Sequence, residues 1–188
     1  VFVVSLDSKR QWYRYHALFA EALHYRLEQT QPDLMLALHY RASLWYAEHD
    51  QTTQAILHAF KARKWHWAAD LIERKSLQLM FLTWGAGHRA MVILQEWIKQ
   101  LPAEVMYSRP RLCLACCQLL WAVVPQTTLE AWLEAAEATL TALLMTQTHE
   151  DASSSTMLTP QVRQDLENRL GEVITFRAVV RGHQEGGL

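Results

Sequence analysis

The first apolar and polar positions of the chain predict a β-hairpin. Residues 2–6 are mostly β-branched or apolar, residues 7–11 are polar, and bulky aromatics alternate with a charge over 12–15. Two short strands around a polar turn have this pattern. From His16 onward, apolar residues recur every three or four positions, which predicts a helix that ends before Pro32. A hairpin and one helix cannot bury their apolar side chains alone, so residues 1–31 are expected to end a small domain.

Beyond Pro32, apolar positions at helical spacing predict a series of antiparallel helix pairs. The predicted helices cover residues 32–50, 53–63, 65–83, 88–101, 110–125, 129–144 and 160–181. The short connections within the pairs predict αα-hairpins. Pairs that recur every ~30 to 40 residues are typical of an α-solenoid of the tetratricopeptide (TPR) type. We therefore expect residues 32–188 to form TPR-like helical repeats, with a flexible loop near 149–159.

Large side chains alternate with alanine on the stripes that should face inward. Trp45, Trp97 and Trp132 are expected to be large packing residues of the repeats. The stripe that contains Trp45 also includes Leu34 and Leu38. The clearest stripe consists of Leu129, Trp132, Leu133, Ala136, Leu140, Leu143 and Leu144.

Composition agrees with a helical chain. Gly and Pro together supply 11 of the 188 residues, and sandwiches, barrels and doubly wound sheets need more of both for their turns. A hydrophobic content of 51% with 20% charged residues excludes a disordered chain. The predicted fold class is mostly α: an antiparallel helix-pair, TPR-like α-solenoid with a short N-terminal β-hairpin.

Charge and cysteine usage restrict the partners and the compartment. The net charge is −1 and the basic residues are scattered, so we expect no direct binding of nucleic acid by this segment. The longest apolar run, residues 112–124, is shorter than the ~20 residues of a membrane span. The three cysteines lie within five positions, which favours a reducing, cytoplasmic location over a disulfide-bonded one. The chain opens on Val1 without a signal-peptide pattern, which suggests a piece of a longer protein.

Histidines and carboxylates offer little for catalysis. His16 and His24 are eight positions apart, as are His58 and His66, so neither pair has the spacing of two ligands on one helix and no metal site is predicted. The carboxylates expected on the polar, solvated side of their helix are Glu130, Glu134 and Glu137. No phosphate-binding loop or nucleophile motif occurs, so we expect neither a cofactor nor catalytic residues in this segment.

The cysteines leave two alternatives. Cys113 lies early in its predicted helix, with Cys116 three residues later, and helix N-terminal amides lower the pKa of a nearby thiol. The simpler interpretation is a small apolar face that is buried between helices. An enzyme that uses Cys113 or a histidine cluster is therefore a hypothesis that ranks behind a protein-interaction module, either regulatory or a plain scaffold.

The aromatic and basic cluster over residues 12–16 is the most unusual local feature. Such a cluster suits base stacking or phosphate binding, and the alternative is a hairpin whose aromatics pack on the following helix. His16 is expected at the start of that helix, where free N–H groups favour an anion. It is therefore well placed to join a phosphate site that another domain contributes.

These residues also resemble a known family. Residues 12–19, with Leu6 and Asp7 before them, resemble the end of the winged-helix domain in MalT-type, LuxR-family ATP-dependent transcriptional regulators, which belong to the STAND class of signal-transduction ATPases. Similar segments follow in the order that the family shows: 41–46, 54–59, 67–73, 97–102 and 109–113. The resemblance extends over about residues 1–140 and implies that residues 1–31 are the C-terminal part of a winged-helix domain.

The resemblance implies a multidomain sensor. In this class an ATPase core and a winged helix precede helical repeats that receive an inducer, and a C-terminal helix-turn-helix binds DNA. A histidine after the wing contacts the β-phosphate of ADP and holds the resting state closed, and His16 is the matching position. Ala17 stands where related animal and plant proteins often have Asp. The implied cofactor of the full-length protein is ATP or ADP.

The implied partners are the protein's own ATPase domain and an inducer or regulatory protein on the repeats, with oligomerisation on activation. The segment itself is not expected to be an enzyme, whereas the full-length protein is expected to be a STAND ATPase. The alternative is a stand-alone, TPR-like scaffold for protein–protein interaction without any link to a nucleotide.

Overall fold

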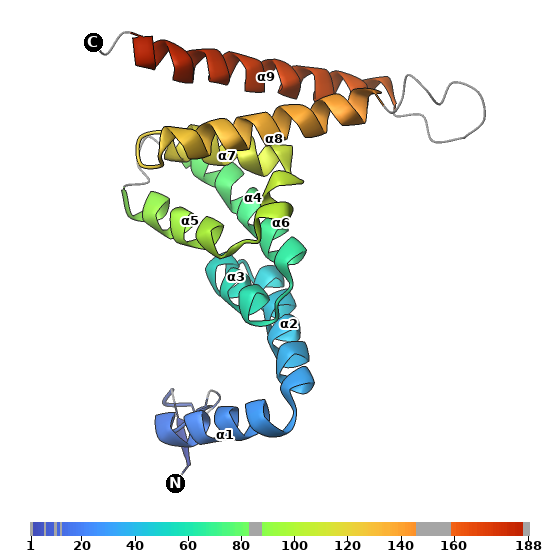
Figure 1. The fold of residues 1–188 in the computed structure, drawn as a ribbon. Coiled ribbons are helices and arrows are strands. Elements are labelled where there is room, and N and C mark those ends of the chain that lie inside the picture. Colours follow the sequence, from blue (N-terminus) through green and yellow to red (C-terminus); the bar gives the residue numbers. More distant parts are fainter. Residues whose placement is uncertain are drawn as a thin grey trace, which may run out of the picture. The chain divides into compact units, whose positions relative to one another are not determined.

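The computed structural model describes residues 2–5, 7–9, 11, 13–82, 88–145 and 159–185. Tertiary contacts divide the chain into an N-terminal unit, Val1–Lys64, and a C-terminal unit, Trp65–Leu188. The described residues are mostly helical and contain a two-stranded antiparallel sheet near the N-terminus, as the sequence predicts (Figure 1). The proposed boundary between residues 31 and 32 stays a prediction.

The N-terminal unit begins with the expected hairpin. Strands β1 (Val3–Ser5) and β2 (Tyr13–Tyr15) pair antiparallel, with Val3 opposite Tyr15 and Ser5 opposite Tyr13. The turn between them is held by Asp7, whose Oδ1 accepts a hydrogen bond of 2.9 Å from the backbone N–H of Gln11. Trp12, which the sequence analysis placed in the aromatic cluster, lies outside the described residues.

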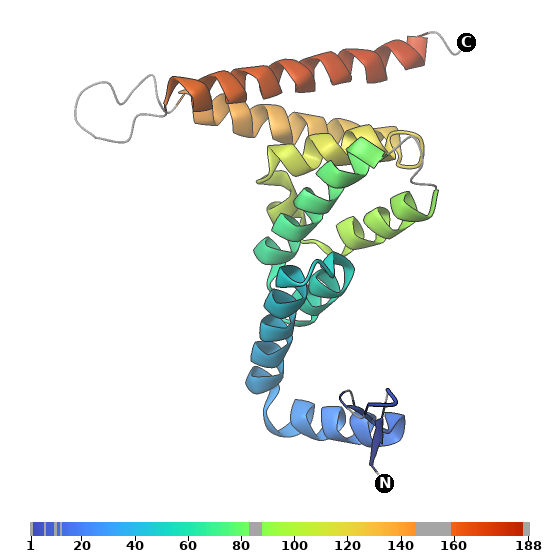
Figure 2. The same cartoon turned by 180° about the vertical axis from the view of Figure 1, so that it is seen from behind.

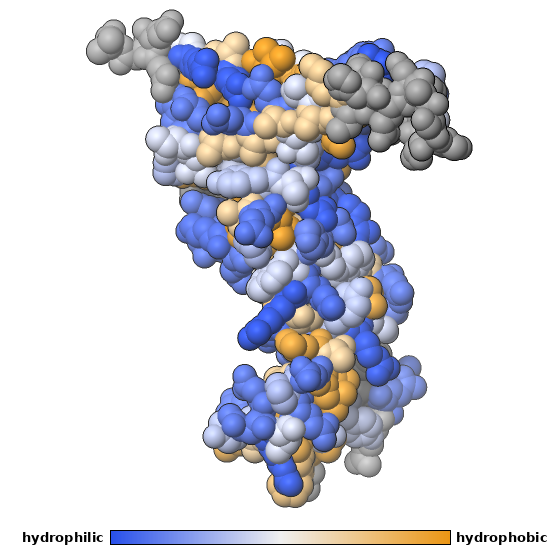
Figure 3. Space-filling model, turned by 45° about the vertical axis from the view of Figure 1, so that its right-hand side comes forward, coloured by the Kyte–Doolittle hydropathy of each residue, from blue (hydrophilic) through white to orange (hydrophobic). Residues whose placement is uncertain are grey.

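Helix α1 (Ala17–Thr30) follows the hairpin and has no buried residue. The rings of Phe2 and Tyr15 contact Phe19, with centroids 4.5 and 5.5 Å away, so the hairpin packs on the first turn of α1. Leu18, on the same helix, is 70% exposed. Figure 3 shows hydrophobic surface on this part of the N-terminal unit, at the bottom of the view. The helix is thus confirmed, but its apolar residues are not buried.

Helices α2 (Pro32–Glu48) and α3 (Thr52–Lys61) form the αα-hairpin that the sequence predicts. The residues buried in it are Ser43, Ala55, Ile56, Ala59 and Phe60. Ser43 Oγ donates a hydrogen bond of 2.7 Å to the carbonyl oxygen of Ala55, so the helices approach closely at this small residue.

The expectation that Trp45 faces inward is wrong. Its side chain is 45% exposed, and Leu34 and Leu38 on the same stripe are also exposed. The physical reason is that α2 meets α3 through the small residue Ser43, which leaves the larger side chains at the edge of the contact. Trp45 instead stacks on the imidazole of His49, at a centroid distance of 3.9 Å.

The C-terminal unit is built around helix α7. Its helices are α4 (Trp65–Leu82), α5 (His88–Gln100), α6 (Ala103–Tyr107), α7 (Pro110–Leu120), α8 (Gln126–Met145) and α9 (Pro160–Glu185). Eight of the eleven residues of α7 are buried. Helices α4, α5, α6 and α8 pack on α7, and α9 packs on α8, which can be followed from both sides in Figures 1 and 2. The predicted pairing of residues 110–125 with 129–144 is therefore confirmed.

Burial in this unit agrees with most of the predicted stripes. Trp97 and Trp132 are buried, as expected, and the α8 stripe is buried from Leu129 to Leu140. Leu143 is exposed, contrary to expectation, because it lines an open surface cavity with Pro110 and Leu166 instead of the core. Helix α6 was not predicted, since it has only five residues, although Val105 and Met106 in it are buried.

Two further expectations concern the ends of helices. The predicted turn over 84–87 and most of the loop near 149–159 lie outside the described residues. The final helix, expected over 160–181, extends from Pro160 to Glu185.

Among the described helices, none combines the length and the apolar composition that a membrane span requires.

Candidate functional site

His16 joins β2 to α1 and is the N-cap of that helix. Its backbone N–H donates a hydrogen bond of 2.8 Å to the carbonyl oxygen of Phe2, and its own carbonyl accepts one of 2.9 Å from Ala20. These two bonds fix the backbone of His16 between the sheet and the helix. The side chain is exposed and makes no capping hydrogen bond.

The start of α1 keeps the properties of an anion site. The first turn contains no acidic residue, and the side chain of its N-cap residue forms no capping hydrogen bond. The positive end of the helix dipole and the free N–H groups of Ala17 and its successors therefore have no competing carboxylate within that turn. His16, as the N-cap residue, directly precedes them in the chain. The arrangement could bind a phosphate that reaches it from outside this segment.

The other described residues of the aromatic cluster are a packing residue, Tyr15, and two exposed residues, Tyr13 and Arg14. Tyr15 packs edge-on against Phe19, as expected for a hairpin whose aromatics cover the following helix. Tyr13 and Arg14 are exposed, and Arg14 lies opposite Val4 in the sheet. The cluster is therefore partly structural, and His16 remains its candidate for ligand contact.

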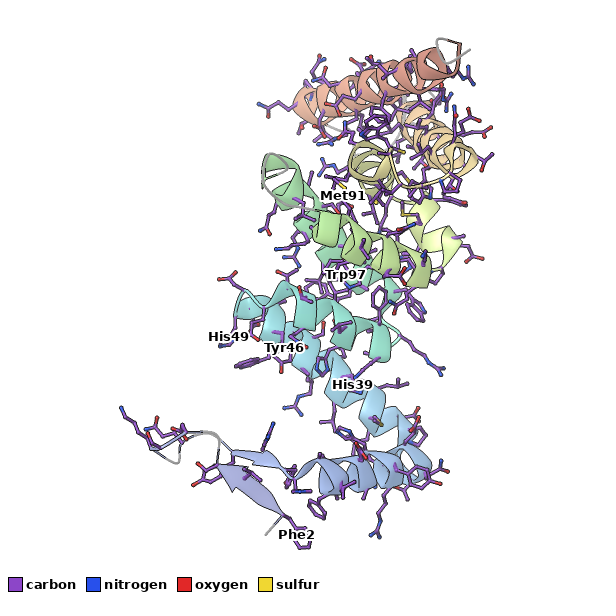
Figure 4. All side chains as sticks on the ribbon, turned by 90° about the vertical axis from the view of Figure 1, so that its left-hand side faces the viewer. Phe2, His39, Tyr46, His49, Met91 and Trp97 are labelled. Atoms are coloured by element: carbon purple, nitrogen blue, oxygen red, sulfur yellow. The ribbon has the colours of Figure 1, made fainter. Side chains whose placement is uncertain are left out.

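A second group of histidines, which the sequence analysis missed, lies between α2 and α3. The Nδ1 atoms of His39 and His58 are 3.0 Å apart, and the ring of Tyr46 lies 5.2 Å from that of His58. Figure 4 shows His39 and Tyr46 along α2. A hydrogen bond between two Nδ1 atoms requires one to donate and the other to accept, so this pair holds a single proton between those atoms.

Burial and neighbouring positive charge lower the pKa values of both histidines. The pKa of His39 is lowered by burial first, then by His58, Lys61 and His24. The pKa of His58 is lowered by burial first and then by Lys61. Both effects oppose the charged imidazolium. A register argument could have found the pair, because residues 39 and 58 lie at nearly equal distances from the turn at His49 and Asp50.

His39 also lines a polar cavity of about 450 Å³ in the N-terminal unit. Helix α1 contributes His24 and Glu28, helix α2 contributes Asp33, and the end of the unit contributes Lys61 and Arg63. Both positive and negative side chains line this cavity. The mixture provides partners for a polar ligand but does not select one sign of charge.

The three cysteines are buried thiols in the core of the C-terminal unit. Burial raises the pKa values of Cys113 and Cys117 to about 12, and raises that of Cys116 as well. The Sγ atom of Cys113 donates a weak hydrogen bond of 3.3 Å to the carbonyl oxygen of Met106. A nucleophilic cysteine requires the opposite shift. The interpretation of the cysteines as a buried apolar face is confirmed.

The other candidates for catalysis are dispersed. Across the residues that the structure describes, no three His, Cys, Asp or Glu side chains gather in a group that could hold a metal ion. Glu137 was expected on a solvated face, but it forms an ion pair with Arg177 of α9 and is only partly exposed. Its role is therefore to connect two helices.

Comparisons with known proteins give one domain and several relatives. Residues 1–35 match the family described as the MalT winged helix domain. The chain is 33% identical over 115 residues to the serine/threonine-protein kinase PknK of Mycobacterium tuberculosis and of Mycobacterium bovis. The match covers 61% of this chain and 10% of each kinase, so the chain spans about a tenth of the length of these relatives. No solved structure matches the chain. The comparisons therefore support a MalT-like N-terminal segment that ends within α2.

Proposed function

We propose that this chain is the winged-helix end and the helical sensor region of a MalT-type, LuxR-family, ATP-dependent transcriptional regulator of the STAND class. The observation that carries the proposal is the match of residues 1–35 to the MalT winged helix domain, in which His16 is exposed at the start of α1. The rest of this regulator, with its nucleotide-binding and DNA-binding domains, lies outside the segment. Its place of action would be the cytoplasm, in agreement with three free cysteines.

The helical part is the proposed sensor, with TPR-like repeats. The α2–α3 hairpin and the α7–α8 pair support repeated helix pairing, and Trp97 and Trp132 are buried at the positions that large repeat residues should occupy. The similarity to the kinases named PknK covers 115 residues, so it extends beyond the 35 of the winged-helix match into the helices. Because that match covers a tenth of the kinases, their kinase activity is not transferred to this chain.

His16 is the proposed contact between this segment and the nucleotide. The ADP phosphate would come from the protein's own ATPase domain, and His16 and the first N–H groups of α1 would bind it together. An inducer or a regulatory protein on the helical region would favour a state in which His16 releases ADP. Exchange for ATP and oligomerisation would then activate the regulator.

The exposed apolar side chains of the hairpin and α1 also support this assignment. Phe2, Leu18 and Tyr25 are each about two-thirds exposed, and α1 buries none of its residues. A hairpin and a single helix need a further partner to bury such side chains. The remainder of a winged-helix domain would supply that partner.

The test compares two histidines in the intact regulator. We expect His16→Ala to weaken ADP retention about tenfold or more, the cost of one hydrogen bond to a charged group, and to raise basal transcription. His66→Ala is the matched control, because His66 is also an exposed histidine in the first turn of a helix. Unchanged ADP retention in His16→Ala would show that His16 has no role in the switch.

The same measurement tests the alternative function, a stand-alone TPR-like scaffold that binds a peptide or protein. An intact protein that retains no ADP in either form would favour the scaffold. Retention that depends on His16, and not on His66, would favour the regulator.

A further inference from the structure

An apolar cavity of about 320 Å³ lies among three helices of the C-terminal unit. Its walls come from the end of α7, the start of α8 and the C-terminal half of α9. The side chains that define it are Trp121, Val124, Leu129, Phe176, Val180 and Gln126. We call it the α7–α9 cavity. Its volume falls in the lower part of the range of small-molecule sites, which begins at roughly 300 Å³.

Gln126 provides a polar group in this cavity that lacks a partner. Its Nε2 atom is buried and finds no hydrogen-bond acceptor among the described residues. A buried amide donor without an acceptor is destabilising, and native proteins satisfy most such groups. Because this atom has almost no accessible surface, a ligand oxygen in the cavity would satisfy it once the Gln126 amide turns toward the cavity.

The remaining lining determines the chemistry of the ligand. None of the described side chains around the cavity is Asp, Glu, Lys, Arg or His. A nucleotide or a carboxylate would lose its hydration here without gaining an opposite charge. A sugar would need more polar partners than the side-chain amides of Gln118 and Gln126 supply. The aromatic walls, Trp121 and Phe176, suit a compact apolar body.

We propose that the α7–α9 cavity binds a small, neutral, mostly apolar molecule whose carbonyl oxygen accepts a hydrogen bond from Gln126 Nε2. The ligand would touch α7, α8 and α9 at once and so strengthen the docking of α9. That docking already includes ion pairs from Arg177 to Glu137 and from Arg111 to Asp165. The proposal is independent of the proposed function, since it concerns a site within the C-terminal unit alone.

Three matched probes test the ligand class on the full 188-residue chain. Acetophenone has an aromatic body and a carbonyl, ethylbenzene has the same shape without the oxygen, and benzoate carries a charge. We expect acetophenone to shift the indole N–H resonance of Trp121, assigned with Trp121→Phe, and benzoate to leave it unchanged. Failure of both neutral probes to shift it up to their solubility limits, or equal binding of benzoate, would overturn the proposal.

Gln126→Met tests the hydrogen bond. The substitution keeps the length of the side chain and removes the donor, so acetophenone should bind about three- to tenfold more weakly, as the loss of one neutral hydrogen bond requires. Ethylbenzene should bind at least as well as before. If both probes respond equally to the substitution, Gln126 does not bind the oxygen.

Two further variants test the site independently if Gln126→Met alters folding. Val180→Trp places a large side chain in the cavity and should abolish acetophenone binding. Val162→Trp is the control, because Val162 is exposed on the same helix and does not line the cavity. Equal binding by the two variants would show that acetophenone occupies another place.

Discussion

At the scale of single residues, two helix ends in the N-terminal unit are closed by residues other than glycine. Asp50 has φ 58° after α2, and Arg63 has φ 54° after α3. In both cases the next residue's N–H reaches back to the helix: Gln51 to the Tyr46 carbonyl at 2.9 Å, and Lys64 to the Ala59 carbonyl at 3.0 Å. These are Schellman motifs, in which glycine is usual because it has no Cβ. No glycine stands at His49–Asp50, and Asp50 itself adopts the left-handed backbone there.

The first prediction concerns the cost of that backbone. Arg63→Gly should raise the free energy of unfolding by about 0.5–1 kcal/mol, because glycine avoids the left-handed penalty of an L-residue and only part of the gain is lost to its greater freedom in the unfolded chain. Arg63→Ala, which removes the side chain but keeps the Cβ, should give no increase. Urea denaturation would measure both. An equal rise in the two variants would assign the effect to the side chain of Arg63.

At the scale of elements, contacts between helices determine the surroundings of His39, His58 and Arg109. His39 and His58 face each other across the α2–α3 hairpin, with Lys61 of α3 and His24 of α1 nearby, and Glu28 and Asp33 on the adjoining cavity. In the C-terminal unit, Arg109 connects the start of α7 to α4. Its guanidinium binds Asp70 and the carbonyl oxygen of His66, the latter at 3.1 Å, and its side chain is only 19% exposed.

The histidine pair predicts that the α2–α3 hairpin loses stability in weak acid. The folded pKa values of His39 and His58 lie below the ordinary value of 6.5, so the unfolded chain takes up protons first as the pH falls through 6.5. The urea midpoint should therefore be lower at pH 5.5 than at pH 7.5. His39→Gln should show a smaller decrease, because it removes one of the two titrating groups.

His66→Gln is the control for this pH dependence, because His66 is exposed and stands outside the hairpin. It should show the same decrease as the unsubstituted chain. A decrease in His39→Gln as large as in the control would contradict the assignment of the pH effect to the pair.

Arg109 predicts a larger effect on stability than an exposed arginine. Arg109→Met should lower the free energy of unfolding by about 1–3 kcal/mol, because it leaves Asp70, Glu73 and the His66 carbonyl without a charged donor. Arg163→Met breaks an exposed pair with Glu167 within α9 and should cost about 0.5 kcal/mol or less. Thermal unfolding at one pH would compare the stabilities of the two variants. Similar losses of stability would mean that Arg109 contributes no more than an exposed arginine.

At the scale of the whole molecule, burial is distributed unevenly over the described residues. Helix α7 buries eight of its residues, whereas α1 buries none. The core of the N-terminal unit lies mainly on α3 and the core of the C-terminal unit surrounds α7. Regions with few buried apolar contacts open more readily than the core. We therefore expect the hairpin and α1 to be the least stable of the described parts.

This distribution predicts the order of hydrogen exchange. In the isolated 188-residue chain, the amides of α1 should exchange fastest among the described helices, and those of α7 should exchange slowest, as mass spectrometry of peptides would show. Under the proposed function, joining the chain to the remainder of a winged-helix domain should slow exchange in α1 and leave α7 unchanged. Slow exchange of α1 in the isolated chain would contradict its description as an unburied helix.

Most of the secondary structure could be predicted because it depends on local order along the chain. The period of the apolar residues and the prolines at positions 32, 110 and 160 located the helices, and each of these prolines begins one. Helix α6 was too short for a period to be visible. The apolar stripes predicted burial correctly where a helix is covered from several sides, as at Trp97 and Trp132. They predicted it wrongly at Trp45, whose helix is covered only in part.

The sequence by itself determined the longer helices, the hairpin and the position of His16 before α1, because each depends on neighbouring residues and on side-chain type. It favoured the burial of the cysteines but left a reactive thiol as the alternative. Only the tertiary structure decided that His39 meets His58, that Arg109 binds Asp70, and that Gln126, which lines an apolar cavity, has no acceptor for its Nε2 atom among the described residues. These contacts join residues of different helices. They depend on the relative rotation and register of the packed helices, which a pattern along one helix does not specify.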